Sequence, residues 1–140
     1  MAPKDPNTFM VFQQRFLSGQ PQLNPVLDAL GETLTRLWDL YDPLCANSII
    51  VSVFEFLTAT CMEPKLERLP RIRSTQRFPW FIRERNGVGV AYALFMFAKS
   101  SRTDIMEFIQ AIPDMNFWID ATNDLMSSVL FIYRVALCVI

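Results

Sequence analysis

The sequence contains no histidine, and this absence excludes the most familiar metal and catalytic sites. Imidazole is a ligand in most zinc and copper centres, the base of Ser-His and Cys-His pairs, and the commonest general base. A metal site in this chain must therefore be built from oxygen ligands. The three cysteines, at positions 45, 61 and 138, form no CxxC pair, which indicates reduced interior side chains rather than a disulfide framework. We therefore expect a cytoplasmic protein.

A charge excess of either sign is also lacking, because thirteen basic and fourteen acidic residues give a net charge of -1. A general nucleic-acid binder needs a summed positive field, so we expect no nucleic-acid partner. The N-terminus lacks the apolar core of a signal peptide. Residues 125–140 are apolar except for Arg134, but they are shorter than the roughly 20 residues that a bilayer crossing needs. We expect no stable membrane insertion, and a tail anchor formed by these residues is the alternative.

The apolar residues that make up 51% of the 140-residue chain follow a helical spacing throughout. Neither period-2 runs nor Asn-Gly turns between strands are found, so the pattern predicts an all-α fold of about six helices. We expect a surface helix after the cap signal Asn24-Pro25, with an apolar stripe from Val26 to Tyr41 that includes Trp38. The remaining expected segments are an interior helix over 49–62, a helix over 77–99 kinked at Gly87 and Gly89, a short helix from about 101 with Ile109 inward and ended by Pro113, and a last helix from about 114.

One local excess of positive charge lies between residues 63 and 85, which include seven basic and three acidic residues. Loops between helices commonly carry solvated Arg and Lys, so most of this segment needs no ligand. Further along, Asn123 and Ser127 are four residues apart, which places their oxygens on one helix face as a two-point site for a hard cation. At this spacing such side chains more often face solvent or bond to the backbone. Arg83, however, lies forty residues upstream. An arginine together with a cation held by Asn123 and Ser127 would suit a diphosphate.

Three stretches in order resemble the fungal class I sesquiterpene cyclases of the trichodiene synthase family. They are FIRERNGVG at residues 81–89, Ala98-Lys99, and NDLMS at residues 123–127. Residues 44–63 resemble the family's buried helix, and Lys4-Asp5-Pro6 resembles the end of its aspartate-rich motif. The resemblance therefore covers nearly everything from residue 4 to residue 127. It implies part of the helical barrel of the terpenoid synthases.

The resemblance also implies a function, namely a Mg²⁺-dependent sesquiterpene cyclase that ionises farnesyl diphosphate and cyclises the carbocation to a hydrocarbon. In that family the Asn, Ser and Glu of the motif NDxxSxxxE bind one of three Mg²⁺ ions, which implies metal ligands at Asn123 and Ser127. The arginine that opens the family's RxNG segment binds the substrate diphosphate, and Arg83 matches it. The match assigns no general acid or base.

The sequence departs from the family at both metal motifs. The third ligand position falls at Phe131, where the family has a glutamate, so the motif lacks its anionic ligand for Mg²⁺. Of the aspartate-rich motif the chain keeps at most Asp5. From residue 128 the sequence no longer resembles the family. We therefore expect a terpene synthase fragment over 1–127 and an apolar tail over 128–140, of the kind that read-through into an intron would add.

These departures lead to the prediction that the chain is inactive in this form, because about six helices cannot close a barrel that keeps water from a carbocation. The alternative is a non-catalytic helical remnant or interaction protein. Exposed apolar helix faces would then favour self-association. Whether the chain is an enzyme stays open at the level of its sequence.

Overall fold

The structure, a computed structural model, describes residues 7–66, 77–86 and 88–137. Over these ranges the regular structure consists of α-helices and two short 3₁₀ helices, which confirms the expected all-α class. Lys4-Asp5-Pro6, residues 67–76 of the basic segment, Gly87 and Cys138 lie outside the described residues.

The N-terminal part of the chain forms α1 (Asn7–Met10), α2 (Phe12–Leu17) and α3 (Pro25–Leu40). The predicted cap of α3 is confirmed, because the Asn24 side chain accepts a 2.8 Å hydrogen bond from the Val26 amide and Pro25 occupies the first turn. The apolar stripe is narrower than expected. Val26 is 62% exposed because it lies at the margin of the face that buries Leu27, Leu34 and Leu37, and Trp38, near the end of the helix, is 40% exposed.

The long helix α4 (Pro43–Leu66) follows and occupies the centre of the molecule. Its buried side includes Ile49, Phe54 and Leu57, as expected for an interior helix, but Val51 is 55% exposed. The helix is therefore covered on most sides rather than all round. Of the helices described, α4 alone is long and apolar enough to cross a membrane, with 44% of its most apolar window buried. A core helix passes the same test.

The expected kink near the glycines is present as a complete break between α5 (Phe78–Asn86) and α6 (Gly89–Phe95). Val88 stands at the break with a φ of 41°, in the left-handed region that a β-branched residue rarely adopts. A Cβ atom on Gly89 would lie 2.1 Å from Oδ1 of Asn116. A side chain at this position would therefore have to displace the Asn116 side chain, so the glycine accommodates the close approach of the last helix.

The remaining elements are η1 (Lys99–Ser101), α7 (Ile105–Phe108), η2 (Ile109–Ala111) and α8 (Ile112–Leu137). The short helix begins later than expected, at Ile105, and Ile109 is 37% exposed rather than inward. Pro113 does not end that helix. It lies in the first turn of α8, where its missing N–H would have no intrahelical acceptor in any case.

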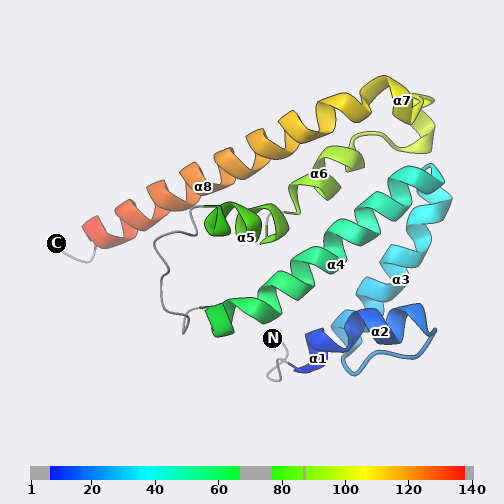
Figure 1. The fold of residues 1–140 in the computed structure, drawn as a ribbon, viewed down its shortest axis with the longest axis horizontal. Helices are drawn as coiled ribbons and strands as arrows, with labels where there is room; N and C mark the ends of the chain where they lie inside the picture. Colours follow the sequence, from blue (N-terminus) through cyan, green and yellow to red (C-terminus); the bar gives the residue numbers. More distant parts are fainter. Residues whose placement is uncertain (1–6, 67–76, 87, 138–140) are drawn as a thin grey trace.

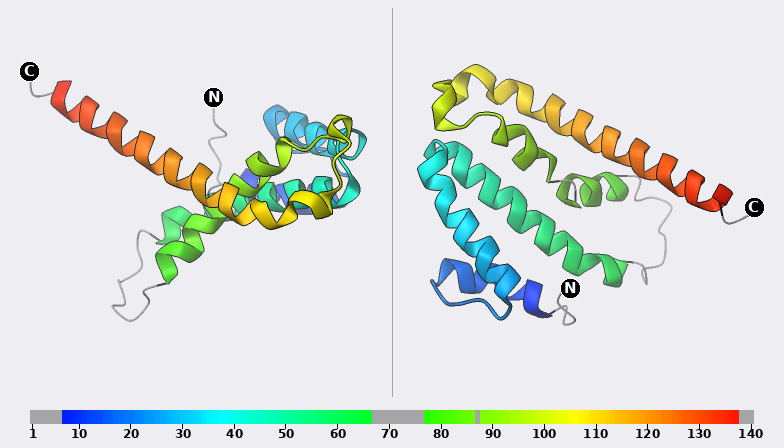
Figure 2. Two further views of the ribbon diagram at one scale, coloured as in Figure 1. Left: turned by 90° about the horizontal axis from the view of Figure 1, so that it is seen from above. Right: turned by 180° about the vertical axis from the view of Figure 1, so that it is seen from behind.

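The helices lie side by side in an open row (Figure 1). From one edge to the other, α1 to α3 pack on α4, α4 packs on α5 and α6, and α8 crosses the outer side of α6. Figure 2 shows that the C-terminal turns of α8 extend past the other helices in both further views. The helices therefore form an open row rather than a closed bundle.

The core is centred on aromatic and aliphatic side chains from α2, α4 and α6. The rings of Phe12, Phe16 and Phe54 contact one another with centroids 5.6 to 6.2 Å apart, and Phe12, Ile49 and Leu94 are almost completely buried. Cys45 is buried and Cys61 half-buried, and both are free thiols, as the sequence predicts. Burial raises the pKa of both thiols, which disfavours the reactive thiolate.

Candidate functional site

Arg83 extends from α5 to α8 and makes the two ion pairs found among the residues that the structure describes. Its Nε donates a 2.9 Å hydrogen bond to Oδ2 of Asp124, and its Nη2 donates a 2.8 Å hydrogen bond to the main-chain oxygen of Asp120. Nη2 also lies 3.5 Å from Oδ1 of Asp120. The guanidinium is therefore held on two sides by one turn of α8.

The two aspartates differ sharply in exposure. The side chain of Asp120 is 13% exposed, and its Oδ1 is buried without a hydrogen bond, whereas the side chain of Asp124 is 62% exposed. Burial raises the pKa of the Asp120 carboxyl above its ordinary value of 3.8. The Arg83 guanidinium opposes this shift and Asp124 adds to it. Arg83 thus has one buried partner and one partner in water.

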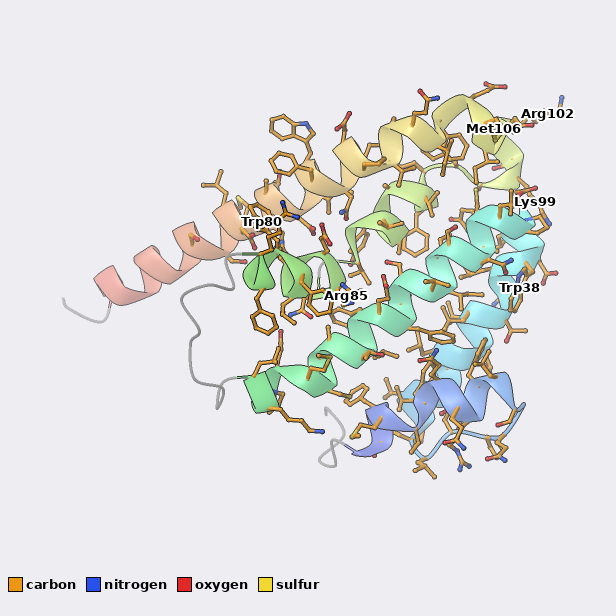
Figure 3. All side chains as sticks on the ribbon, viewed as in Figure 1. Trp38, Trp80, Arg85, Lys99, Arg102 and Met106 are labelled. Atoms are coloured by element: carbon orange, nitrogen blue, oxygen red, sulfur yellow. The ribbon has the colours of Figure 1, made fainter. Side chains whose placement is uncertain are left out.

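Arg85, two positions along α5, has different surroundings because residues two apart on a helix point in nearly opposite directions. Its guanidinium carbon lies 3.9 Å from the centre of the Phe81 ring, and it donates a hydrogen bond to the Phe81 oxygen. Figure 3 shows Arg85 on the side of α5 that faces α4. The two arginines therefore carry the same charge to opposite faces of one helix.

The two predicted metal ligands, Asn123 and Ser127, lie on the same face of α8 as the partners of Arg83. At about 100° per residue, Asp120, Asn123, Asp124 and Ser127 all fall within an arc of about 100°. Asn123 and Ser127 are exposed on α8. The structure thus places Asn123 and Ser127 on the face of α8 that Arg83 contacts through Asp120 and Asp124.

The donor set on this face does not by itself fit a Mg²⁺ ion. Asn123 and Ser127 offer neutral oxygens, and the nearby carboxylates of Asp120 and Asp124 already face Arg83. Within the described ranges, no group of three or more acidic or cysteine side chains is arranged to hold a metal. Mg²⁺ binding needs at least one available carboxylate, and position 131 carries a phenylalanine. We therefore assign no chemical step to a metal on these residues alone.

A second feature near the site is a groove along α4, which we call the α4 groove. It comprises three adjoining pockets of about 190, 280 and 290 Å³, between α1 and α2 on one side and α5 and α6 on the other. Its lining is mainly apolar and includes Phe9, Val51, Phe54, Leu57, Met62 and Arg85. The lining does not include Arg83. A larger pocket of about 450 Å³ lies between α2 and α3, away from these residues.

Comparison with known proteins identifies the family of the chain. Residues 2–133 match the family model described as trichodiene synthase (TRI5). The chain belongs to the trichodiene synthase family. It is 36% identical over 118 residues to "Terpene synthase BipA" of Cochliobolus sativus and 36% identical over 121 residues to "Longiborneol synthase CLM1" of Gibberella zeae. It is also 32% identical over 120 residues to "(E)-beta farnesene synthase" of Metarhizium brunneum.

These matches cover 83%, 84% and 83% of the chain, in the same order, and 36% of each relative. The chain thus spans about a third of the length of these trichodiene synthase relatives. Membership in the family confirms the resemblance carried by residues 81–89 and 123–127. The division of the chain at residue 127 stays a prediction.

Within this family member, sequence reasoning missed the partners of Arg83. Asp120 and Asp124 are four residues apart, so both carboxylates lie on one face of α8, and this spacing was the available signal. Asp124 was noted as part of the NDLMS stretch but was given no role. A contact across 37 to 41 residues of sequence follows from helix packing, which the spacing alone does not specify.

Proposed function

We propose that this chain forms the diphosphate-binding part of a terpene cyclase site, with Arg83 as the residue that contacts the diphosphate. The observation that carries the proposal is the position of Arg83 beside the face of α8 that carries Asn123 and Ser127. The guanidinium is a bidentate donor suited to phosphate oxygens, and it contacts that face through Asp120 and Asp124. The substrate proposed for the intact site is farnesyl diphosphate, in keeping with family membership.

The role of Mg²⁺ is the finer part of the proposal. Asn123 and Ser127 would supply two of the ligands that the family uses for one ion, and this chain lacks the third at Phe131. We therefore propose that the 140-residue chain binds the diphosphate group without turning the substrate over. The cytoplasmic location also stays a prediction.

The first experiment compares Arg83→Ala with Arg85→Ala in the full 140-residue chain. Calorimetric titration with inorganic pyrophosphate is expected to show a loss of about tenfold or more in affinity for Arg83→Ala, because charge-assisted hydrogen bonds are removed. Arg85→Ala removes the same charge from the other face of α5 and is expected to change the affinity little. Equal losses in both variants would contradict a specific role for Arg83.

Farnesyl diphosphate in the same titration separates recognition of the diphosphate group from recognition of the farnesyl hydrocarbon. Tighter binding than pyrophosphate indicates that an apolar surface also takes part, and equal binding indicates recognition of the diphosphate group alone. Gas chromatography of the reaction is expected to show no cyclised hydrocarbon, and its detection would overturn the proposed inactivity. The alternative, a helical remnant that binds a partner or nothing, is favoured if neither diphosphate binds.

A further inference from the structure

We propose that Asp124 is a tethered competitor of the diphosphate: it occupies Arg83 in the free chain and must be displaced when the ligand binds. This inference rests on the proposed function and concerns how the same site is regulated. It starts from the unequal way in which α8 holds the guanidinium. One contact uses the main-chain oxygen of Asp120, and the other uses the exposed carboxylate of Asp124.

The contact to Asp120 is fixed to the helix. A main-chain oxygen inside α8 cannot rotate away, and the Asp120 side chain beside it is 13% exposed. This contact fixes Nη2 of Arg83 at α8, while Nε is directed to the exposed carboxylate of Asp124.

The contact to Asp124 is the replaceable one. Its side chain is 62% exposed, so the freed carboxylate would be hydrated rather than buried. The Arg83 side chain is 23% exposed, and an ion pair whose carboxylate lies in water contributes little, whereas a diphosphate brings several negative charges to the same donor. The ligand therefore wins the competition for Nε, but it binds more weakly than it would if that edge of Arg83 were free.

Asp124 also lies beside the two predicted metal ligands, Asn123 and Ser127. It is the next residue after Asn123 and precedes Ser127 by three positions, on the same turn and the next turn of α8. Displacement of Asp124 therefore occurs beside both side chains. Asp124 acts here through Arg83, as a positioning residue with an opposing charge.

The test is the affinity of the full chain for inorganic pyrophosphate, measured by calorimetry in Asp124→Asn and in the control Asp114→Asn. Both variants remove one negative charge from an exposed position on α8, but Asp114 lies about 15 Å along the helix from Asp124. At about 0.15 M salt this distance exceeds the Debye length of roughly 8 Å. We expect Asp124→Asn to bind pyrophosphate about two- to fivefold more tightly, and Asp114→Asn to match the unmodified chain.

A merely structural role for Asp124 predicts the opposite sign, because damage to α8 would weaken binding. Unchanged or weaker binding by Asp124→Asn overturns the inference, and so does an equal gain in Asp114→Asn. Arg83→Ala separates this failure from failure of the proposed function. If Arg83→Ala loses affinity while Asp124→Asn gains none, the competitor role is wrong and diphosphate binding stands. If Arg83→Ala binds like the unmodified chain, or if no variant binds, both ideas fail.

Discussion

At the scale of single residues, Arg83 and Arg85 have the same chemistry but different contacts in the structure. Both are arginines in one segment of excess positive charge, and family resemblance distinguished Arg83 from its neighbours. The structure adds a physical distinction, since Arg83 contacts α8 and Arg85 lies over the Phe81 ring. What could not be read from the sequence is that Asp120 and Asp124 are the partners, because helix periodicity does not say which helices become neighbours.

Asp120 leads to a prediction about pH. Its pKa is raised in the folded chain above the ordinary value of 3.8, mainly by burial. At a pH between the ordinary and the raised pKa, the folded state therefore holds a proton that the unfolded state has lost. The free energy of unfolding therefore falls as the pH rises through that window. Asp120→Asn cannot ionise and keeps the main-chain contact with Arg83.

We expect the stability of Asp120→Asn relative to the unmodified chain to increase as the pH rises from about 3.8 toward neutrality. Urea unfolding at a series of pH values, followed by circular dichroism, measures this difference. The contributions of the other carboxylates are common to both proteins and cancel in the difference. Asp124→Asn provides the matched comparison for the loss of a carboxylate beside Arg83 at an exposed position. A stability difference for Asp120→Asn that does not vary with pH would contradict the assigned role of burial.

At the scale of elements, the break between α5 and α6 was largely predictable. Gly87 and Gly89 within a helical pattern indicated a kink, and the structure separates two helices at that point. The left-handed conformation of Val88 was not predictable, because valine disfavours it. The role of Pro113 was misread because a proline fits the first turn of a helix as well as the end of the preceding one.

The two described helical glycines provide an element-scale prediction with an internal control. A Cβ atom on Gly89 would meet Oδ1 of Asn116 at 2.1 Å, whereas one on Gly31 would meet the ring of Phe16 at an ordinary 3.6 Å. We expect Gly89→Ala to lower the free energy of unfolding by about 1–3 kcal/mol through overpacking. Gly31→Ala is expected to raise it by up to about 1 kcal/mol, because alanine favours the helix.

Chemical denaturation of both variants measures the contrast. If Gly89→Ala is as stable as Gly31→Ala, then α6 and α8 do not approach as closely as the structure indicates. Oδ1 of Asp120 would lie 3.2 Å from the added Cβ atom, so this comparison examines how α6 packs on the turn of α8 that Arg83 contacts.

At the scale of the whole molecule, the open row of helices leaves large apolar side chains in contact with water. Trp80, Trp118 and Leu125, from α5 and α8, are 62%, 68% and 64% exposed. Composition and helical spacing predicted an all-α chain with one core, and that prediction is confirmed. They did not predict which faces stay uncovered, because an amphipathic pattern does not distinguish a face packed within this chain from a face packed elsewhere.

We expect the 140-residue chain to self-associate, because large apolar side chains left in contact with water are stabilised by removal from it. Sedimentation velocity over a range of concentrations should reveal species heavier than the 16.2 kDa chain, with a fraction that grows with concentration. The double variant Trp80→Gln with Trp118→Gln should reduce that fraction. A single species of monomer mass at about 100 µM, where micromolar apolar contacts would be saturated, would contradict this expectation.

The main-chain oxygen that holds Arg83 has a consequence for how this site tolerates mutation. Its acceptor comes with the helix, so the anchorage persists whichever side chain occupies position 120, provided that α8 continues through it. The contact with Asp124, in contrast, depends on one exposed carboxylate and is lost with a single substitution. Substitutions at position 124 are therefore expected to change the availability of Arg83, while the main-chain contact preserves its orientation.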